Sequence, residues 1–201
     1  MPTAVDLHYP QSCPFCAIAN AYPSTPSDSL SSYIPSSPDP ARVSPECHLI
    51  LCTPTVLAFL DIQPMTRGHV LVISRRHAEK LGDLKNGEGG ALGSWLPVLS
   101  RAVCKVTGVG DWNTVQNNGI RAAQVVPHVH FHIIPRPETV PSLQARSWTM
   151  FGKGQREELD DDEGAKLAGE MREVLRMELG RAGEEEEEEE EGEAAAGKAK
   201  L

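Results

Sequence analysis

The chain has 201 residues, of which 40% are hydrophobic, and a formal net charge of −9 at pH 7. This length suits one domain with tails, and no apolar run is long enough to cross a bilayer. Most of the negative charge comes from a glutamate run over 184–193, and the nearly neutral remainder has no basic footprint for nucleic acid. We therefore expect no membrane and no nucleic acid among the partners.

Two segments have the composition of flexible chain. The serine- and proline-rich stretch 22–45 predicts a flexible loop inserted into the domain, and the acidic end predicts a disordered tail over 181–201. Residues 1–11 form an N-terminal tail without the pattern of a signal peptide, and five scattered cysteines do not resemble a disulfide framework. We therefore expect a domain over 12–136 and a C-terminal extension with a helix over 137–180, in a reducing compartment, cytoplasmic and/or nuclear.

Hydrophobic periodicity predicts an α+β domain with five strands and two main helices. Leu92, Leu96 and Leu99 recur at helical intervals in the first main helix, and an acidic start suits the dipole of the second. The expected elements are a short helix Pro14–Asn20, strands His48–Cys52, Val56–Asp61 and His69–Ser74, the helix Gly90–Val106, strands Trp112–Gln116 and Val125–Ile134, and the helix Asp162–Leu179.

The last of these strands contains the most informative pattern in the chain. His128, His130 and His132 alternate with apolar residues, so in a strand the three imidazoles share one face and the apolar side chains share the other. Three explanations compete: a solvated face that happens to carry histidines, a metal site, and nucleophilic catalysis by one imidazole. The clearly apolar opposite face disfavours the first.

A loop precedes the histidine strand. Asn117, Asn118 and Gly119 form a strong turn signal after the short strand that ends at Gln116. Amide side chains and free backbone N–H groups are good phosphate ligands. The loop therefore predicts either a phosphate site or an ordinary hairpin connection.

Three blocks together resemble the histidine-triad (HIT) superfamily. Residues 128–134, His-Val-His-Phe-His-Ile-Ile, resemble its signature, in which histidines alternate with apolar residues. Residues 59–73 resemble its Asp-Ile-x-Pro…Gly-His block, and residues 13–16 resemble the N-terminal Cys-x-x-Cys of zinc-containing members. The match covers roughly residues 10–18 and 47–136. It implies a HIT-like five-stranded antiparallel sheet with two main helices, usually in a homodimer.

The resemblance implies a chemistry for the triad itself. His130 matches the nucleophile that attacks the α-phosphorus of a nucleotide and forms a covalent nucleotidyl-histidine, which water then hydrolyses. An imidazole suits this task because it is nucleophilic when neutral and a good leaving group when protonated. His132 matches a phosphate-contacting residue, and His128 is the first histidine of the triad.

Further substrate contacts are implied outside the triad. Asp61 matches a carboxylate that accepts hydrogen bonds from ribose hydroxyls, and Asn117 matches a polar residue near the scissile phosphate. Gln124 and the backbone of Val125 fall where the family contacts phosphate oxygens, and His69 matches a further histidine near the site. Candidates for an apolar base pocket are Ile18, Phe59 and Ile62.

The chain departs from the family pattern at two positions of the loop. Val125 stands where many relatives have a serine or threonine whose hydroxyl touches the phosphate, so only its N–H remains for that contact. Ala123 occupies a position often held by glycine, where a methyl group limits close backbone approach.

The resemblance also implies a structural zinc site. The zinc-containing members use two cysteines, a histidine after the third strand and the first histidine of the triad, which correspond here to Cys13, Cys16, His77 and His128. The alternative is that the two cysteines are reduced bystanders. A redox pair would need a βαβ context that the sequence does not show.

Two classes of function remain open. The first is a nucleotide hydrolase or nucleotidyl transferase with a purine nucleotide substrate. The zinc ligands and Asp61 resemble the Hint-like branch of the family, which implies a nucleoside phosphoramidate. Gln124 and the Ile-Ile-Pro-Arg ending of residues 133–136 resemble the Fhit-like branch, which implies a dinucleoside polyphosphate. The second is a non-catalytic nucleotide-binding module. The intact triad argues against lost catalysis.

Overall fold

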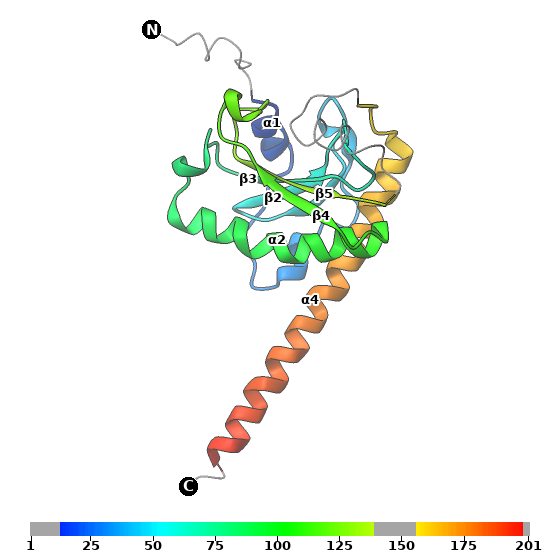
Figure 1. Cartoon of the computed structure of the whole chain (residues 1–201). Helices are drawn as coiled ribbons and strands as arrows, with labels where there is room; N and C mark the ends of the chain where they lie inside the picture. The colour runs from blue at the N-terminus through cyan, green and yellow to red at the C-terminus, as the bar shows by residue number, and fades with distance from the viewer. Residues whose placement is uncertain (1–12, 139–155, 199–201) are drawn as a thin grey trace.

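A single antiparallel sheet forms the centre of the computed structural model, which describes residues 13–138 and 156–198 (Figure 1). The strands run in the order β1-β2-β3-β5-β4, and every neighbouring pair is antiparallel. Their bounds are β1 Leu49–Cys52, β2 Val56–Leu60, β3 Val70–Ser74, β4 Trp112–Gln116 and β5 His130–Pro135. The expected five-stranded antiparallel sheet is confirmed. The expected tail 1–11 lies outside the described residues.

Strand β5 begins at His130, later than the predicted Val125. The chain turns at Val126, whose carbonyl accepts a hydrogen bond from the N–H of His128 at 2.8 Å. The N–H of Val129 donates to the carbonyl of Ala78 at 2.7 Å. Pro127 has no N–H for a strand ladder. His128 therefore precedes the strand, while His130 and His132 share one face of it.

Within residues 13–138 and 156–198, three α-helices accompany the sheet: α1 Pro14–Ala21, α2 Asn86–Thr107 and α4 Asp161–Lys198. Helix α2 begins before the predicted Gly90, because the carboxylate of Glu88 accepts the N–H of Lys85 at 2.8 Å and caps a first turn that its glycines obscure. It ends at Thr107 and is followed by the capping residue Gly108, which adopts a φ of 70°. No helix within the described ranges has both the length and the apolar character needed to cross a bilayer.

The helices cover the two faces of the sheet unequally. Helices α2 and α4 pack on one face, where Val129 and Ile133 join the larger hydrophobic core (Figure 1). Helix α1 packs on the other face, where Phe15 joins Leu71 and Ile73 in a smaller core. The alternation along β5 therefore points Phe131 and Ile133 at the large core and the two histidines at the α1 side, as the sequence pattern predicts.

The stretch 22–45 is not the flexible loop that its composition predicts. Tyr22 is buried in the smaller core and Ile34 in the larger one, so the segment passes around the edge of the sheet formed by β1. Ser24 donates to the carbonyl of Cys52 at 3.0 Å, and Arg176 of helix α4 donates to the carbonyl of Pro35 at 3.0 Å. Burial of two large side chains and these polar contacts offset the entropy of ordering a serine- and proline-rich chain.

The acidic end also differs from its prediction. Helix α4 continues through the glutamate run to Lys198 and extends away from the sheet, where a disordered tail over 181–201 was expected (Figure 1). Glutamate and alanine are both good helix formers, and a helix satisfies its own backbone hydrogen bonds. Residues 199–201 lie outside the described chain.

Gly164, in the first turn of α4, permits close packing of that helix on His48. A Cβ at this position would lie 2.5 Å from two atoms of the buried His48 ring, whereas one at Gly169 would meet only the Arg172 side chain at 3.8 Å. Both substitutions to alanine gain the same helix propensity. We expect Gly164→Ala to be less stable than Gly169→Ala by about 1–3 kcal/mol in urea unfolding. Equal stabilities would show that the His48 ring moves aside freely.

Candidate active site and metal centre

The orientation of His130 is fixed by a bond from its ring to the neighbouring backbone. Its Nδ1 lies 2.6 Å from the carbonyl oxygen of His128. Because a carbonyl only accepts, Nδ1 carries the proton and Nε2 carries the lone pair. Burial lowers the pKa of His130 below its ordinary value, so the ring is neutral at neutral pH. The site thus holds an imidazole in its nucleophilic form.

His132 is fixed by a chain of bonds through His69. The N–H of Met65 donates to Nδ1 of His69 at 3.2 Å, and Nε2 of His69 lies 2.9 Å from Nδ1 of His132. Burial and the nearby His132 lower the pKa of His69 well below its ordinary value, so His69 is neutral and its proton sits on Nε2. The Oδ2 of Asp61, 3.3 Å from Nδ1 of His69, therefore makes no ion pair with it.

The proton on His132 follows from this chain. Because His69 donates to Nδ1 of His132, the remaining hydrogen of His132 lies on Nε2. Burial and His130 lower the pKa of His132 to about 3, so this ring is also neutral. The two histidines of β5 thus have different forms: His130 offers a lone pair at Nε2, and His132 offers an N–H donor. A donor of this kind suits a phosphate oxygen.

A cavity of about 440 Å³ adjoins both rings. Its wall contains His130 and His132 together with three predicted substrate contacts, Asp61, Asn117 and Val125. The three candidates for the base pocket also line it: Ile18, Phe59 and Ile62. The volume falls in the range of about 300–1,000 Å³ that is usual for small-molecule sites. The structure therefore brings the predicted nucleophile, polar contacts and apolar wall to one place.

Asp61 is a buried carboxylate at the end of β2. Its Oδ1 accepts the N–H of Gln63 at 2.9 Å, which leaves further lone pairs for a ligand. Burial raises the pKa of Asp61, while the Gln63 bond and the positive charge of Arg156 oppose that rise. A carboxylate held in this way can accept hydrogen bonds from hydroxyl groups.

Gln124 does not reach the cavity, which corrects the prediction that it contacts phosphate. Its side chain is buried, its Oε1 accepts the N–H of Gly119 at 2.5 Å, and its Nε2 donates to the carbonyls of Glu79 at 2.6 Å and His128 at 3.3 Å. These bonds occupy both amide hydrogens. Gln124 instead holds the loop between β4 and β5 in shape.

Phe15 and Arg156 are among the cavity-wall residues that sequence reasoning missed. Phe15, between the two cysteines of the N-terminal motif, packs edge-on against the His130 ring with centroids 5.2 Å apart. Its place in a short apolar helix was the available signal. Arg156 lies in the C-terminal extension, and no pattern around it in the sequence indicates a role in the site. The stretch 147–155, whose position the sequence also leaves open, lies outside the described residues.

The four predicted zinc ligands meet at the N-terminal end of α1. Their candidate ligand atoms all lie within 4.8 Å of one another: Cys13, Cys16, His77 and His128. Sγ of Cys13 is 3.4 Å from Nδ1 of His128, and Sγ of Cys16 is 3.3 Å from Nδ1 of His77. A tetrahedral zinc ion, with bonds of about 2.3 Å to sulfur and about 2.0 Å to nitrogen, holds its ligand atoms about 3.5 Å apart. The donor set therefore fits zinc.

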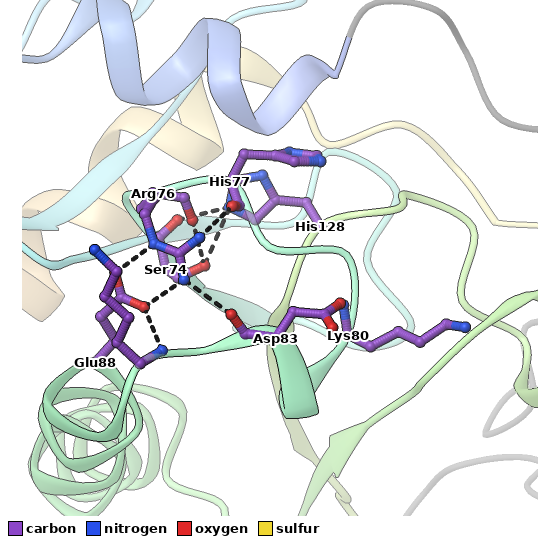
Figure 2. A network of polar contacts seen from close by, with 8 residues as sticks. Ser74, Arg76, His77, Lys80, Asp83, Glu88 and His128 are labelled. Carbon is purple, nitrogen blue, oxygen red and sulfur yellow. Dashed lines mark hydrogen bonds and ion pairs between the residues drawn. The ribbon is translucent and has the colours of Figure 1, made fainter.

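Hydrogen bonds outside the cluster orient the ring of His128 and hold the backbone of His77. Nε2 of His128 donates to the carbonyl of Ser74 at 2.6 Å, which directs the Nδ1 lone pair at the cysteines. Arg76 donates to the carbonyl of His77 at 3.0 Å while its guanidinium pairs with Glu88 at the start of α2 (Figure 2). Burial lowers the pKa of His128 to about 4, so its ring is neutral. Helix α2 thus braces the loop that carries His77.

Comparison with known proteins agrees with this geometry. The family model described as HIT domain matches residues 43–139. A protein from Candida albicans named adenosine 5′-monophosphoramidase is 36% identical over 140 residues, which cover 66% of this chain and 83% of that relative. This chain belongs to the HIT family.

Two further HIT proteins define the extent of the similarity. A Schizosaccharomyces pombe protein named adenosine 5′-monophosphoramidase is 44% identical over 91 residues. The aligned residues cover 45% of this chain and 65% of that relative. A solved structure of a zinc-bound histidine triad protein from Mycobacterium smegmatis superposes with a TM-score of 0.53 at 25% identity, covering 86% of this chain and 96% of the other. The chain thus spans just under two thirds of the S. pombe relative.

The two departures from the HIT pattern both lie in the cavity wall. Val125 is 78% exposed and lines the cavity with an apolar side chain. Ala123 adopts a φ of 62°, the left-handed conformation that favours glycine, and a residue with a Cβ is strained there. The contact between the Val125 backbone and phosphate stays a prediction.

Proposed function

We propose that this chain is a nucleotide hydrolase that cleaves nucleoside phosphoramidates through a covalent nucleotidyl-His130. The observation that carries the proposal is the bond from Nδ1 of His130 to the His128 carbonyl, which leaves the Nε2 lone pair for attack on phosphorus. The cavity beside this ring has the size and the mixed apolar and polar wall of a nucleotide site. The relatives named adenosine 5′-monophosphoramidase support the same class of substrate.

The reaction has two displacement steps at the α-phosphorus. In the first, Nε2 of His130 forms a bond to phosphorus, the P–N bond breaks, and the leaving nitrogen keeps the electron pair and takes a proton from water. In the second, a water oxygen forms a bond to phosphorus and gives a proton to the hydroxide left by the first step. The Nε2–P bond breaks, and its electron pair returns to Nε2 of His130. The N–H donor of His132 is placed to stabilise the negative charge on the phosphate oxygens in both steps.

The cavity wall supports a purine nucleotide as the substrate. Asp61 accepts from ribose hydroxyls, the polar side chain of Asn117 lies near the scissile phosphate, and Ile18, Phe59 and Ile62 cover the base. The apolar wall stabilises a flat base by burial, and the relatives named adenosine 5′-monophosphoramidase support a purine.

Zinc is the second part of the proposal. The donor set and spacing of the cluster formed by Cys13, Cys16, His77 and His128 support a structural zinc ion, as does the zinc-bound relative from M. smegmatis. Four protein ligands close a tetrahedral site, so this ion would stabilise the fold and activate no water.

The remaining proposals concern assembly and location. We propose a homodimer, because Trp112 on the edge strand β4 is 43% exposed and large exposed aromatic residues favour interfaces. The cysteine usage and charge pattern favour the cytoplasm and/or the nucleus, without a nucleic-acid or membrane partner.

The experiment compares AMP release from adenosine 5′-phosphoramidate and from diadenosine triphosphate, with a His130→Asn variant as the control. We expect the wild-type chain to release AMP faster from the phosphoramidate. Faster release from diadenosine triphosphate would assign the dinucleoside polyphosphate class instead. A folded chain that binds AMP but releases none from either substrate would be a nucleotide-binding module.

A further inference from the structure

Arg156 is held at the cavity wall beside Asp61. Its Nη1 donates to the carbonyl of Gln63 at 3.3 Å and lies 3.9 Å from Oδ2 of Asp61. A second hydrogen bond joins the same two segments: the N–H of Leu159 donates to the carbonyl of Ile62 at 2.9 Å. The Arg156 side chain is only 21% exposed. The C-terminal extension is thus fastened to the turn that follows the predicted ribose carboxylate.

The contacts of Arg156 leave hydrogen-bond donors for a ligand. A guanidinium carries five N–H donors. Within the described part of the chain, only Nη1 has a hydrogen-bond acceptor, the Gln63 carbonyl, and the separation from Asp61 is at the limit of an ion pair. Because the side chain lines the cavity, the remaining donors are available on the side where Asp61 offers its lone pairs.

A ribose diol matches this pair of groups. Each hydroxyl both donates and accepts, while the carboxylate only accepts and the guanidinium only donates. A 2′,3′-diol can therefore donate to Asp61 and accept from Arg156. We propose that Arg156 is a second ribose-recognition residue, which reads the diol together with Asp61 and makes the chain selective for ribonucleotides over deoxyribonucleotides. The inference rests on the proposed hydrolase function and adds a residue from outside the HIT domain match.

A purely electrostatic role for Arg156 makes a different prediction. The positive charge of Arg156 also contributes to the lowered pKa of His132 and of His69. If Arg156 acted only through these rings or through the phosphate, its loss would change the turnover of all nucleotides by the same factor. Recognition of the ribose requires instead that the effect depends on the hydroxyl groups of the sugar.

The test is a comparison of adenosine 5′-phosphoramidate with its 2′-deoxy and 3′-deoxy analogues in wild type and Arg156→Met. We expect wild type to prefer the ribonucleotide by about tenfold or more in kcat/KM, because a hydroxyl-binding site rejects an analogue without the hydroxyl. Arg156→Met should lower kcat/KM for the ribonucleotide by about tenfold, mainly through KM, and leave that of at least one deoxy analogue unchanged. The preference over that analogue therefore disappears.

Arg67→Met is the matched control. Arg67 is 48% exposed, lies after the same turn and pairs with Glu163 of helix α4 at 3.1 Å, so its loss removes the same charge without touching the cavity wall. It should retain the wild-type preference. An equal loss on all three substrates in Arg156→Met, or an unchanged preference, would overturn the inference.

Calorimetric binding separates failure of this inference from failure of the proposed function. If wild type releases no AMP from any phosphoramidate, the hydrolase proposal fails, but the ratio of dissociation constants for AMP and its two deoxy forms still tests Arg156. A ratio that falls to about one in Arg156→Met supports ribose recognition. A ratio that Arg156→Met leaves unchanged refutes it.

Discussion

His130→Asn should release AMP from adenosine 5′-phosphoramidate at least about a thousandfold more slowly than the wild-type chain. The amide of asparagine can still donate to the His128 carbonyl, which now accepts from Nδ1 of His130 at 2.6 Å, but it has no lone pair able to form a bond to phosphorus. No other ring can take its place, because His132 carries its proton on Nε2. Chromatographic measurement of AMP under single-turnover conditions checks the result.

Binding and stability must be measured on the same variant. We expect the dissociation constant for AMP to stay within about tenfold of wild type, because the apolar wall and Asp61 are unchanged. The melting temperature should change little. AMP release by His130→Asn at the wild-type rate would mean that the covalent nucleotidyl-His130 does not form.

Loss of the proposed zinc ion should lower the melting temperature by roughly 10 °C or more. A structural metal contributes several kcal/mol to the free energy of unfolding, and each kcal/mol lost lowers the melting temperature by about 2–4 °C in a chain of this size. Cys16→Ser removes one ligand of a cluster in which burial and the neighbouring Cys13 raise the pKa of the Cys16 thiol to about 11. Bound metal would displace that proton, so zinc uptake should release protons. Elemental analysis and thermal melting check both consequences.

Cys104→Ser is the control for this variant. Cys104 is partly buried in helix α2 and lies outside the cluster, so its substitution tests the loss of a thiol without the loss of a ligand. We expect one zinc per chain in wild type and in Cys104→Ser, and less than that in Cys16→Ser. A wild-type chain without zinc whose melting temperature is unaffected by chelators would show that the cysteines are bystanders.

The sequence predicts this site well where side-chain direction follows from strand geometry. The alternation along β5 places His130 and His132 on one face and Ile133 on the other, and the structure confirms both faces. The spacing of Cys13 and Cys16 within a single helical turn likewise places two thiols together. Local periodicity is enough in these cases because each group is positioned by its own element.

The sequence fails where the outcome depends on contacts between distant segments. The side-chain amide of Gln124 could donate equally well to a phosphate or to the carbonyl of Glu79. Only the fold of the loop determines which of the two it reaches. Arg156 reaches the cavity because Leu159 binds the backbone of Ile62, a contact between residues far apart in the chain. The segment 22–45 is ordered because Ile34 finds a place in the larger core, which its low-complexity neighbours conceal.

The path of segment 22–45 also determines how this sheet can meet another chain. At the β1 edge, Ser24 occupies the carbonyl of Cys52 and Arg172 donates to the carbonyl of Leu49 at 2.7 Å, so backbone acceptors needed for pairing are already engaged. Within the described residues, β4 is the only other edge of the sheet. A sheet with one free edge strand can pair with the free edge strand of one other chain, and the joined sheet then has no free edge left. The fold therefore permits a pair of chains joined strand to strand but resists growth into fibres.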